Sequence, residues 1–272
     1  MQGKRDAVSG ANGVRIGLLT AGSGLPLLLI HGGMSCIEAW EPIWPALSKR
    51  WRVTAMDRRG RGTSGDAAAY AIEQEYGDIG AIAGDLAQQH GGPVDVFAHS
   101  YGATCALGAA ARGAPFRRLA LYEPPGPETA PHAWLQSATA MTTSGRTGQA
   151  MLSFLTEIIG LSPKQVHELK DAPRTYDVLA IVSATLPREG QALASVDLLK
   201  DTQLVRSPVL LLLGQQSPPW AHEITHALSA ALPNPNIVIL PDQGHEAIHS
   251  APDLIVSALT RFFADDTLLT QT

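Results

Sequence analysis

The chain has 272 residues and a mass of 28.7 kDa, and 45% of its residues are hydrophobic against 17% that are charged. This composition is ordinary for a globular protein and excludes wholesale disorder, a collagen-like chain and a coiled coil. Twenty basic and 25 acidic side chains give a formal net charge of −5 without a block of either sign, which argues against nucleic acid as a partner.

The N-terminal residues MQGKRDAVSGANG carry charge but no apolar run behind it, so they lack the pattern of a secretory signal. The longest apolar runs, such as 26–30 and 209–213, are far shorter than the ~20 residues that a membrane crossing needs. We therefore expect a cytoplasmic protein that does not enter a membrane. Cys36 and Cys105 are too few for a disulfide framework, and their small neighbours indicate buried thiols.

Apolar runs of strand length alternate with helix-length patterns along most of the chain. Residues 14–20 alternate like a half-exposed strand, and a glycine-rich turn then leads into the continuous run 26–30. Further runs lie at 52–56, 94–98, 119–122, 209–213 and 237–240, and helical patterns include 72–89, 103–111 and 254–263. Strands that alternate with helices predict an α/β protein with a mostly parallel sheet flanked by helices.

One gap interrupts this alternation. No strand-like run occurs between Tyr122 and Val209, where a proline-rich turn is followed by helical segments at 133–141, 149–159 and 162–169, the last with Ser162 as its N-cap. This predicts a helical insertion. Most of its apolar side chains are expected to pack on one another, and a few are candidates to face a ligand.

The sharpest motif is Ala98-His99-Ser100-Tyr101-Gly102, which joins a buried strand to an alanine-rich helix. A serine in such a tight turn has a strained backbone, so the residues two before and two after it must be small. The following helix places free N–H groups and the positive end of its dipole beside the hydroxyl, where negative charge develops in acyl transfer. We interpret Ser100 as a nucleophile; the alternative is an ordinary N-cap serine.

Two further segments fit acyl transfer. His31-Gly32-Gly33-Met34 follows the strand 26–30, and a backbone N–H there, from Gly33, is expected to join that of Tyr101 as the two donors of an oxyanion hole; alternatively, the glycines simply form a turn. His31 itself is expected to hold the loop by hydrogen bonds. His245 follows the strand 237–240, at the edge where sites in parallel sheets gather, and is our general base rather than a surface histidine.

These motifs, together with Asp57-Arg58-Arg59-Gly60-Arg61-Gly62-Thr63-Ser64, make the chain resemble the α/β-hydrolase superfamily, in its capped, serine-dependent branch. The resemblance spans nearly the whole length. It implies a mixed eight-stranded sheet and hydrolysis through an acyl-enzyme. It also implies a core domain of residues 1–125 and 207–272, with a helical cap, or lid, at 126–206.

The chain departs from this family pattern at the acid of the catalytic triad. Members usually carry Asp or Glu after the seventh strand, where this chain has Gly214-Gln215-Gln216-Ser217. Related hydrolases sometimes take the acid from the neighbouring strand tip, which here carries Glu123. Glu123 is thus either the third catalytic residue or a capping carboxylate in a proline-rich turn.

Two other strings match well-known motifs less well. Gly60-x-Gly62-x-x-Gly65 is followed by Asp85 at a distance typical of dinucleotide binding, but Asp85 falls within a predicted helix rather than at a strand end. His222-Glu223-Ile224-Thr225-His226 matches a zinc motif, but no third histidine follows at the required spacing and the helix would lie outside the sheet. We therefore expect neither a cofactor nor a metal.

Together these observations predict a cofactor-free hydrolase that cleaves a small or medium, largely apolar ester, lactone or thioester. Ser100, His245 and Glu123 form the expected catalytic set, and Met34, His99 and Trp220 are expected beside the small-molecule substrate. The vacant acid position keeps a non-hydrolytic lyase or cyclase open as an alternative, and a ligand-binding protein with little turnover is a second one. A homo-oligomer is compatible with the sequence.

Overall fold

In the computed structural model of the chain, which describes residues 1–171, 173–233 and 235–264, eight strands form a single sheet in the order β1-β2-β4-β3-β5-β6-β7-β8. Strands β1 and β2 run antiparallel to their neighbours, and the remaining strand pairs are parallel. The predicted mostly parallel eight-stranded sheet is therefore confirmed. The strands are β1 (Lys4–Ser9), β2 (Arg15–Ala21), β3 (Pro26–Ile30), β4 (Arg52–Met56), β5 (Val94–His99), β6 (Phe116–Tyr122), β7 (Val209–Gly214) and β8 (Asn236–Leu240).

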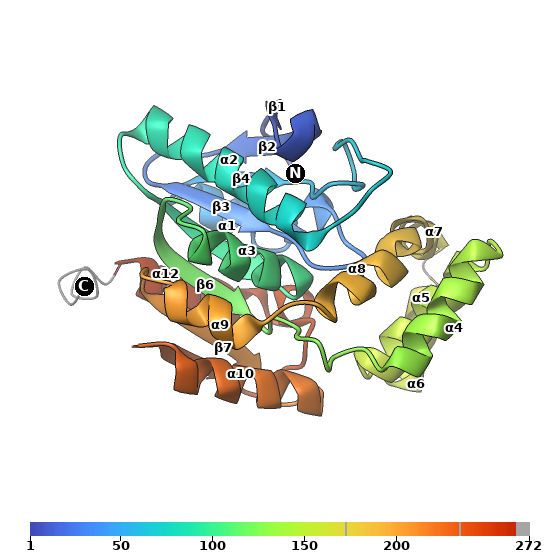
Figure 1. The fold of residues 1–272 in the computed structure, drawn as a ribbon. Coiled ribbons are helices and arrows are strands. Elements are labelled where there is room, and N and C mark those ends of the chain that lie inside the picture. Colours follow the sequence, from blue (N-terminus) through green and yellow to red (C-terminus); the bar gives the residue numbers. More distant parts are fainter. Residues whose placement is uncertain (172, 234, 265–272) are drawn as a thin grey trace.

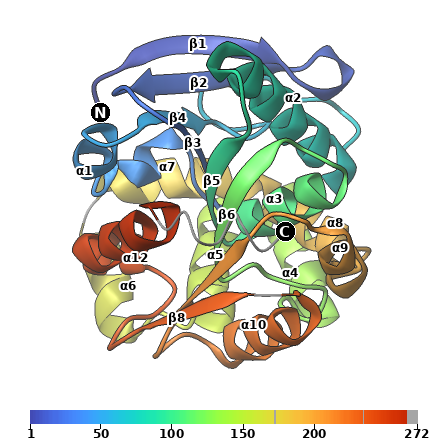
Figure 2. The same ribbon diagram turned by 90° about the vertical axis from the view of Figure 1, so that its left-hand side faces the viewer.

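Helices cover both faces of this sheet (Figure 2). The helices of the α/β layers are α1 (Trp44–Ser48), α2 (Ile72–His90), α3 (Tyr101–Ala111), α9 (Leu198–Leu204), α10 (Pro219–Ala231), α11 (Ala247–Ser250) and α12 (Pro252–Ala264). Because successive side chains of a strand point to opposite faces, Leu28 and Ile30 of β3 pack with α2 and α3, whereas Leu27 and Leu29 pack with α1 and α12. The continuous apolar runs of the sequence are thus strands buried on both faces.

The segment between β6 and β7 contains helices and no strand in its described residues. These helices are α4 (His132–Thr143), α5 (Thr147–Ser153), α6 (Pro163–Lys170), α7 (Pro173–Val182) and α8 (Leu186–Leu193), followed by α9. Figure 1 shows α4 to α7 standing apart from the sheet, with α8 leading back toward it. Helix α9 packs against α3 and α10 as part of the helical layer on the sheet. Ser162 caps α6 as predicted, through a reciprocal pair of hydrogen bonds with Gln165.

Two details differ from the expected elements. Strand β1 was not among the runs recognised along the chain, because it lies at the edge of the sheet and exposes most of its side chains, which leaves it without an apolar pattern. The single helix expected at 149–159 is instead α5 followed by one turn of π-helix, Phe154–Ile158. Among the described residues, no helix is both long enough and apolar enough to cross a membrane.

Candidate active site

Ser100 lies in the turn that joins β5 to α3. Its backbone has φ 53° and ψ −128°, a conformation that L-residues rarely adopt and that clusters at functional sites. Gly102 cannot be larger, because a Cβ atom there would lie 2.3 Å from the carbonyl oxygen of His31. A small residue is thus required at position 102, as predicted, and the structure shows that the contact that limits its size comes from the end of β3 and the loop that follows it.

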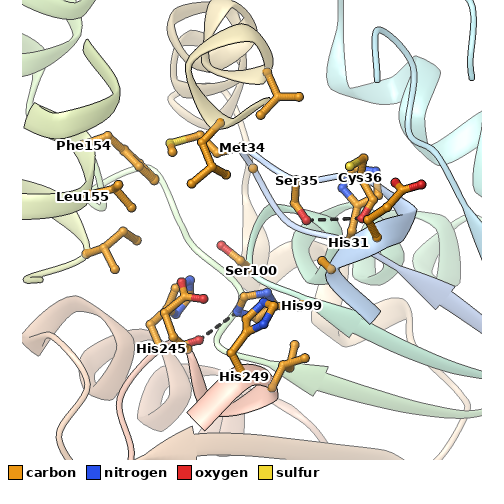
Figure 3. A pocket seen from close by; sticks show the side chains of 18 of the residues that line it. His31, Met34, Ser35, Cys36, His99, Ser100, Phe154, Leu155, His245 and His249 are labelled. Atoms are coloured by element: carbon orange, nitrogen blue, oxygen red, sulfur yellow. Dashed lines mark hydrogen bonds between the residues drawn. The ribbon is translucent and has the colours of Figure 1, made fainter. Parts of the chain in front are cut away.

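The Ser100 hydroxyl faces a cavity between the sheet and the insertion. In Figure 3 it points toward the space bounded by Met34, Phe154 and Leu155. Within the described part of the chain, no hydrogen bond uses this hydroxyl, so it is free to meet a ligand. It also stands at the N-terminus of α3, an 11-residue helix whose dipole favours negative charge at this end.

His245 lines the same cavity as Ser100 and is hydrogen-bonded to Glu123. The distance from His245 Nδ1 to Glu123 Oε2 is 2.5 Å, and the two side chains are 4% and 0% exposed. The other carboxylate oxygen of Glu123 accepts from the backbone N–H of Gly214 at 2.7 Å and from the Ser217 hydroxyl at 2.5 Å. Glu123 is therefore a fully bonded buried acceptor, and it fixes Nδ1 of His245 as the protonated ring nitrogen.

These contacts also set the basicity of His245. Burial by itself lowers the pKa of an imidazole, but the hydrogen bond and negative charge of Glu123 outweigh it and raise the pKa of His245 above its ordinary value. With Nδ1–H donating to Glu123, the other ring nitrogen, Nε2, carries the lone pair. The pair therefore has the arrangement of a general base with its orienting acid.

Two aromatic residues, Tyr122 and His99, hold the loop that carries His245. The Tyr122 hydroxyl donates to the carbonyl of Gly244 and accepts from the N–H of Ala247. His99 Nε2 donates to the carbonyl of His245 at 3.1 Å, and its ring stacks on Tyr122 and lies 4.6 Å from the ring of His245. Burial and the nearby His245 lower the pKa of His99, which keeps it neutral. His99 thus lines the cavity and also supports the His245 loop.

The two backbone amides expected in an oxyanion hole flank Ser100. Gly33 lines both cavities that adjoin the serine, and Tyr101 is the first residue of α3. Neither amide has a hydrogen-bond acceptor among the described residues, so both N–H groups are available to a ligand. His31 is buried and hydrogen-bonded on both ring nitrogens, in agreement with its expected role in holding the loop.

Ser100 and Gly33 lie where two cavities of unequal size meet. The larger, of about 580 Å³, is walled mainly by apolar side chains from the loop after β3, from the π-helical turn Phe154–Ile158 and from α6 and α7. The smaller, of about 40 Å³, is bounded by α4, α8 and Trp220. Met34 lines the larger cavity, and Trp220 faces the ring of His245 edge-on at 5.4 Å while donating to the carbonyl of Ile158. All the residues expected at the site except Glu123 therefore border one composite cavity, and Glu123 lies buried behind His245.

Sequence reasoning missed three residues that contribute to this site. Gly214 and Ser217 supply the hydrogen bonds that hold Glu123, and Glu189 of α8 lies buried at the wall of the smaller cavity. No sequence pattern marks them, because each acts only through a partner more than 90 positions away.

The residues that define the two competing motifs line neither cavity. Asp85 lies inside α2, as expected. His222 and His226 lie on α10, where His226 is exposed. Nowhere in residues 1–171, 173–233 and 235–264 do three or more His, Cys, Asp or Glu side chains gather in a way that could hold a metal ion.

Comparison with known proteins finds consistent similarity. A model of the alpha/beta hydrolase family matches residues 27–258. A solved alpha/beta hydrolase from Sphaerobacter thermophilus is 33% identical, with a TM-score of 0.83, over 95% of this chain and 100% of that one. An enol-lactonase from Burkholderia xenovorans, 20% identical, has a TM-score of 0.80 over 96% of this chain and 100% of that one, and shares the fold.

Among curated proteins, the similarity covers shorter stretches. N-formylmaleamate deformylase of Pseudomonas putida is 32% identical over 154 residues, which are 53% of this chain and 56% of the relative. Probable oxidoreductase EphD of Mycobacterium tuberculosis is 33% identical over 100 residues, 35% of this chain. The match spans only 17% of the length of EphD.

Proposed function

The chain belongs to the alpha/beta hydrolase family, and we propose that it is a carboxylic ester hydrolase that uses Ser100 as nucleophile, His245 as general base and Glu123 as the acid that orients the base. The observation that carries this proposal is the 2.5 Å hydrogen bond between Glu123 and His245, in a cavity that also holds a strained serine at the N-terminus of a helix. The acid that the turn after β7 lacks is supplied by the tip of β6.

The proposed reaction follows from the protonation of these groups. His245 Nε2 takes the proton of the Ser100 hydroxyl as the serine oxygen bonds to the carbonyl carbon of the ester, and the resulting oxyanion is bound by the N–H groups of Gly33 and Tyr101. His245 then gives this proton to the departing alcohol. A water molecule, deprotonated by His245, attacks the acyl-enzyme, and the proton returns to Ser100 as the carboxylic acid leaves.

We propose a small or medium, largely apolar substrate, because apolar side chains dominate the walls of both cavities. Esters, lactones and thioesters share the carbonyl chemistry that this site supports, and the related solved structures include esterases and an enol-lactonase. One side of the scissile bond would occupy the larger cavity, and the other the space of about 40 Å³.

We also propose that residues 126–206 act as a cap on a core of residues 1–125 and 207–272. Helices α4, α6, α7 and α8 and the π-helical turn Phe154–Ile158 supply one wall of the cavities, while the loops at the ends of the strands supply the wall that carries Ser100. Because α9 packs on α3 and α10, the covering function falls to the part of this segment that precedes α9.

The proposal is tested with a series of p-nitrophenyl esters and with a p-nitrophenyl alkylphosphonate, which forms a bond to an activated serine as nitrophenolate leaves. We expect wild-type protein to gain the mass of one phosphonyl group and Ser100→Ala to gain none and to lose ester turnover. Ser35→Ala is the matched control, because Ser35 lines the same cavity without facing the base. Wild-type protein that neither turns over esters nor is labelled would contradict the proposal and favour a ligand-binding protein.

A further inference from the structure

Two side chains form hydrogen bonds with the peptide that joins Gly32 to Gly33. The carbonyl oxygen of Gly32 accepts from His31 Nδ1 at 2.9 Å and from Arg58 Nη1 at 2.9 Å. His31 donates through Nδ1 because its Nε2 accepts from the backbone N–H of Arg58 at 3.0 Å. In a trans peptide the C=O and the following N–H point in opposite directions. Because His31 and Arg58 bind the Gly32 carbonyl, the Gly33 N–H points away from Arg58.

Arg58 is itself held by two buried carboxylates. Its Nη2 lies 2.8 Å from Glu75 of α2 and 2.6 Å from Glu189 of α8, and its Nε donates to Glu75 at 3.2 Å. All three side chains are buried. Burial disfavours the charged guanidinium, but Glu75 and Glu189 outweigh it and keep the pKa of Arg58 well above its ordinary value. Arg58 is thus a permanent cation in one fixed orientation.

The same cluster contacts the residue that supplies the other amide. The guanidinium of Arg58 lies over the ring of Tyr101, 4.5 Å from its centroid. The Tyr101 hydroxyl is 2.8 Å from that of Tyr70, which donates to Glu75 at 3.0 Å. Tyr101 is therefore connected to Arg58 directly through its ring and indirectly through Tyr70 and Glu75.

We propose that Arg58 is a positioning residue that orients both amide donors of the oxyanion hole, by holding the Gly32 carbonyl and by packing on the Tyr101 ring. This inference rests on the proposed function, because it assigns a role within that oxyanion hole. Arg58 acts through the backbone and does not touch the substrate. Since Glu189 comes from α8, the orientation of the hole is tied to the seating of that helix on the core.

Arg58→Lys is the sharpest variant, because lysine keeps the charge but cannot contact Gly32, Glu75, Glu189 and the Tyr101 ring at once. Arg59→Lys is the matched control. Arg59 is the next residue, equally buried and paired with Asp78 at 2.7 Å, but its side chain contacts Ala11, Gln74 and Asp78 instead of the Gly32 carbonyl. Both variants disturb a buried ion pair, so their difference isolates the effect on the oxyanion hole.

The readouts are kcat and KM with a p-nitrophenyl ester, and the affinities of two inhibitors. The Ser100 oxygen adds to the carbonyl carbon of an aryl trifluoromethyl ketone, whose oxygen becomes an oxyanion. The matching secondary alcohol forms no bond to the serine and only occupies the cavity. For Arg58→Lys we expect kcat to fall about 100-fold, as when one oxyanion donor is lost, with a similar loss of ketone affinity. KM and alcohol affinity should stay within threefold. Arg59→Lys should lower Tm but leave kcat and ketone affinity near the wild-type values.

Equal kcat and ketone affinity in the two variants would overturn the inference while leaving the proposed function intact. Full turnover by Ser100→Ala would instead overturn the proposed function. If Arg58→Lys does not fold, Glu75→Gln retains Arg58 but weakens its anchor. We then expect a roughly tenfold fall in kcat and in ketone affinity, and unchanged values would refute the role of Arg58.

Discussion

The turns that follow β6 and β7 lie next to each other, and one carries a hydrogen-bond acceptor while the other supplies its donors. The turn after β6 carries the carboxylate of Glu123, whose backbone φ of 48° is unusual for a residue with a side chain. The turn after β7 carries no acid and supplies two donors, the N–H of Gly214 and the hydroxyl of Ser217. The comparison teaches that the carboxylate bonded to a buried histidine can come from one strand tip when the turn after the neighbouring strand offers hydrogen bonds to it.

The parallel pairing of β6 with β7 explains why the carboxylate can come from either strand tip. Tyr122 of β6 pairs with Leu212 of β7 in parallel, so the two strand tips end side by side below the His245 loop. A carboxylate on either tip is then within reach of one imidazole. A buried carboxylate also needs partners for both of its oxygens, and Glu123 has them in His245, Gly214 and Ser217.

Glu123→Gln gives the largest expected effect and tests whether the β6 turn does carry the acid. An amide cannot stabilise the imidazolium that forms during the reaction and favours the wrong tautomer of His245. We expect kcat to fall by about 10⁴-fold, as for the equivalent change in serine proteases. The measurement is steady-state hydrolysis of a p-nitrophenyl ester, with a thermal melt to verify folding. Full activity in the folded variant would rule out Glu123 as the acid.

The residual activity of Glu123→Gln should also change its pH dependence. The base must be neutral to accept the serine proton, so kcat/KM rises with pH through the pKa of His245. Glu123 raises this pKa against the effect of burial, so removing its charge should move the rising limb to lower pH. A limb that stays in place would mean that another group sets the pKa of His245.

Ser217→Ala tests the contribution of the β7 turn. It removes one of the two donors to Glu123 Oε1 while the Gly214 N–H remains. Loss of one hydrogen bond to a buried carboxylate costs roughly 1–2 kcal/mol, so we expect kcat to fall about tenfold. Ser250→Ala is the control, because Ser250 is exposed and bonds to Gln243 away from Glu123. Equal effects of the two substitutions would remove Ser217 from the account.

Gln216→Glu should have the smallest effect and sharpens the comparison from the other side. It restores an acid to the turn after β7, but Gln216 is exposed, and among the described residues its side chain has no hydrogen-bond partner. We expect esterase activity within twofold of wild type. A sharp rise in activity would mean that the β7 position still governs the histidine, and it would revive the lyase or cyclase interpretation.

The sheet and the position of the serine were predictable because their signals are local. Continuous apolar runs mark strands buried on both faces, and the motif around Ser100 occupies five consecutive positions of the chain. Strand β1 lacks such a signal because water covers much of it. The π-helical turn Phe154–Ile158 could not be distinguished from the α-helix predicted there, because its residues keep helical spacing and apolar character.

The partners of the site could be predicted only in part. Motif order predicts His245 as the base, but whether Glu123 contacts it depends on strand order, which sequence spacing does not contain. The buried cluster of Arg58, Glu75 and Glu189 was not anticipated as a support of the site. Charged residues usually lie at the surface, and these three approach one another only after the loop following β4, α2 and α8 have packed together.

The unequal cavities on the two sides of Ser100 have a consequence for chain-length tolerance. A space of about 40 Å³ has room for only a few atoms, whereas 580 Å³ accommodates a drug-sized group. Homologous series extended on one side of the cleaved bond should therefore reach an abrupt cutoff after a few carbons, and series extended on the other side should continue to react. The protein would then be selective for the length of the group in the smaller cavity and tolerant of the length of the group in the larger one.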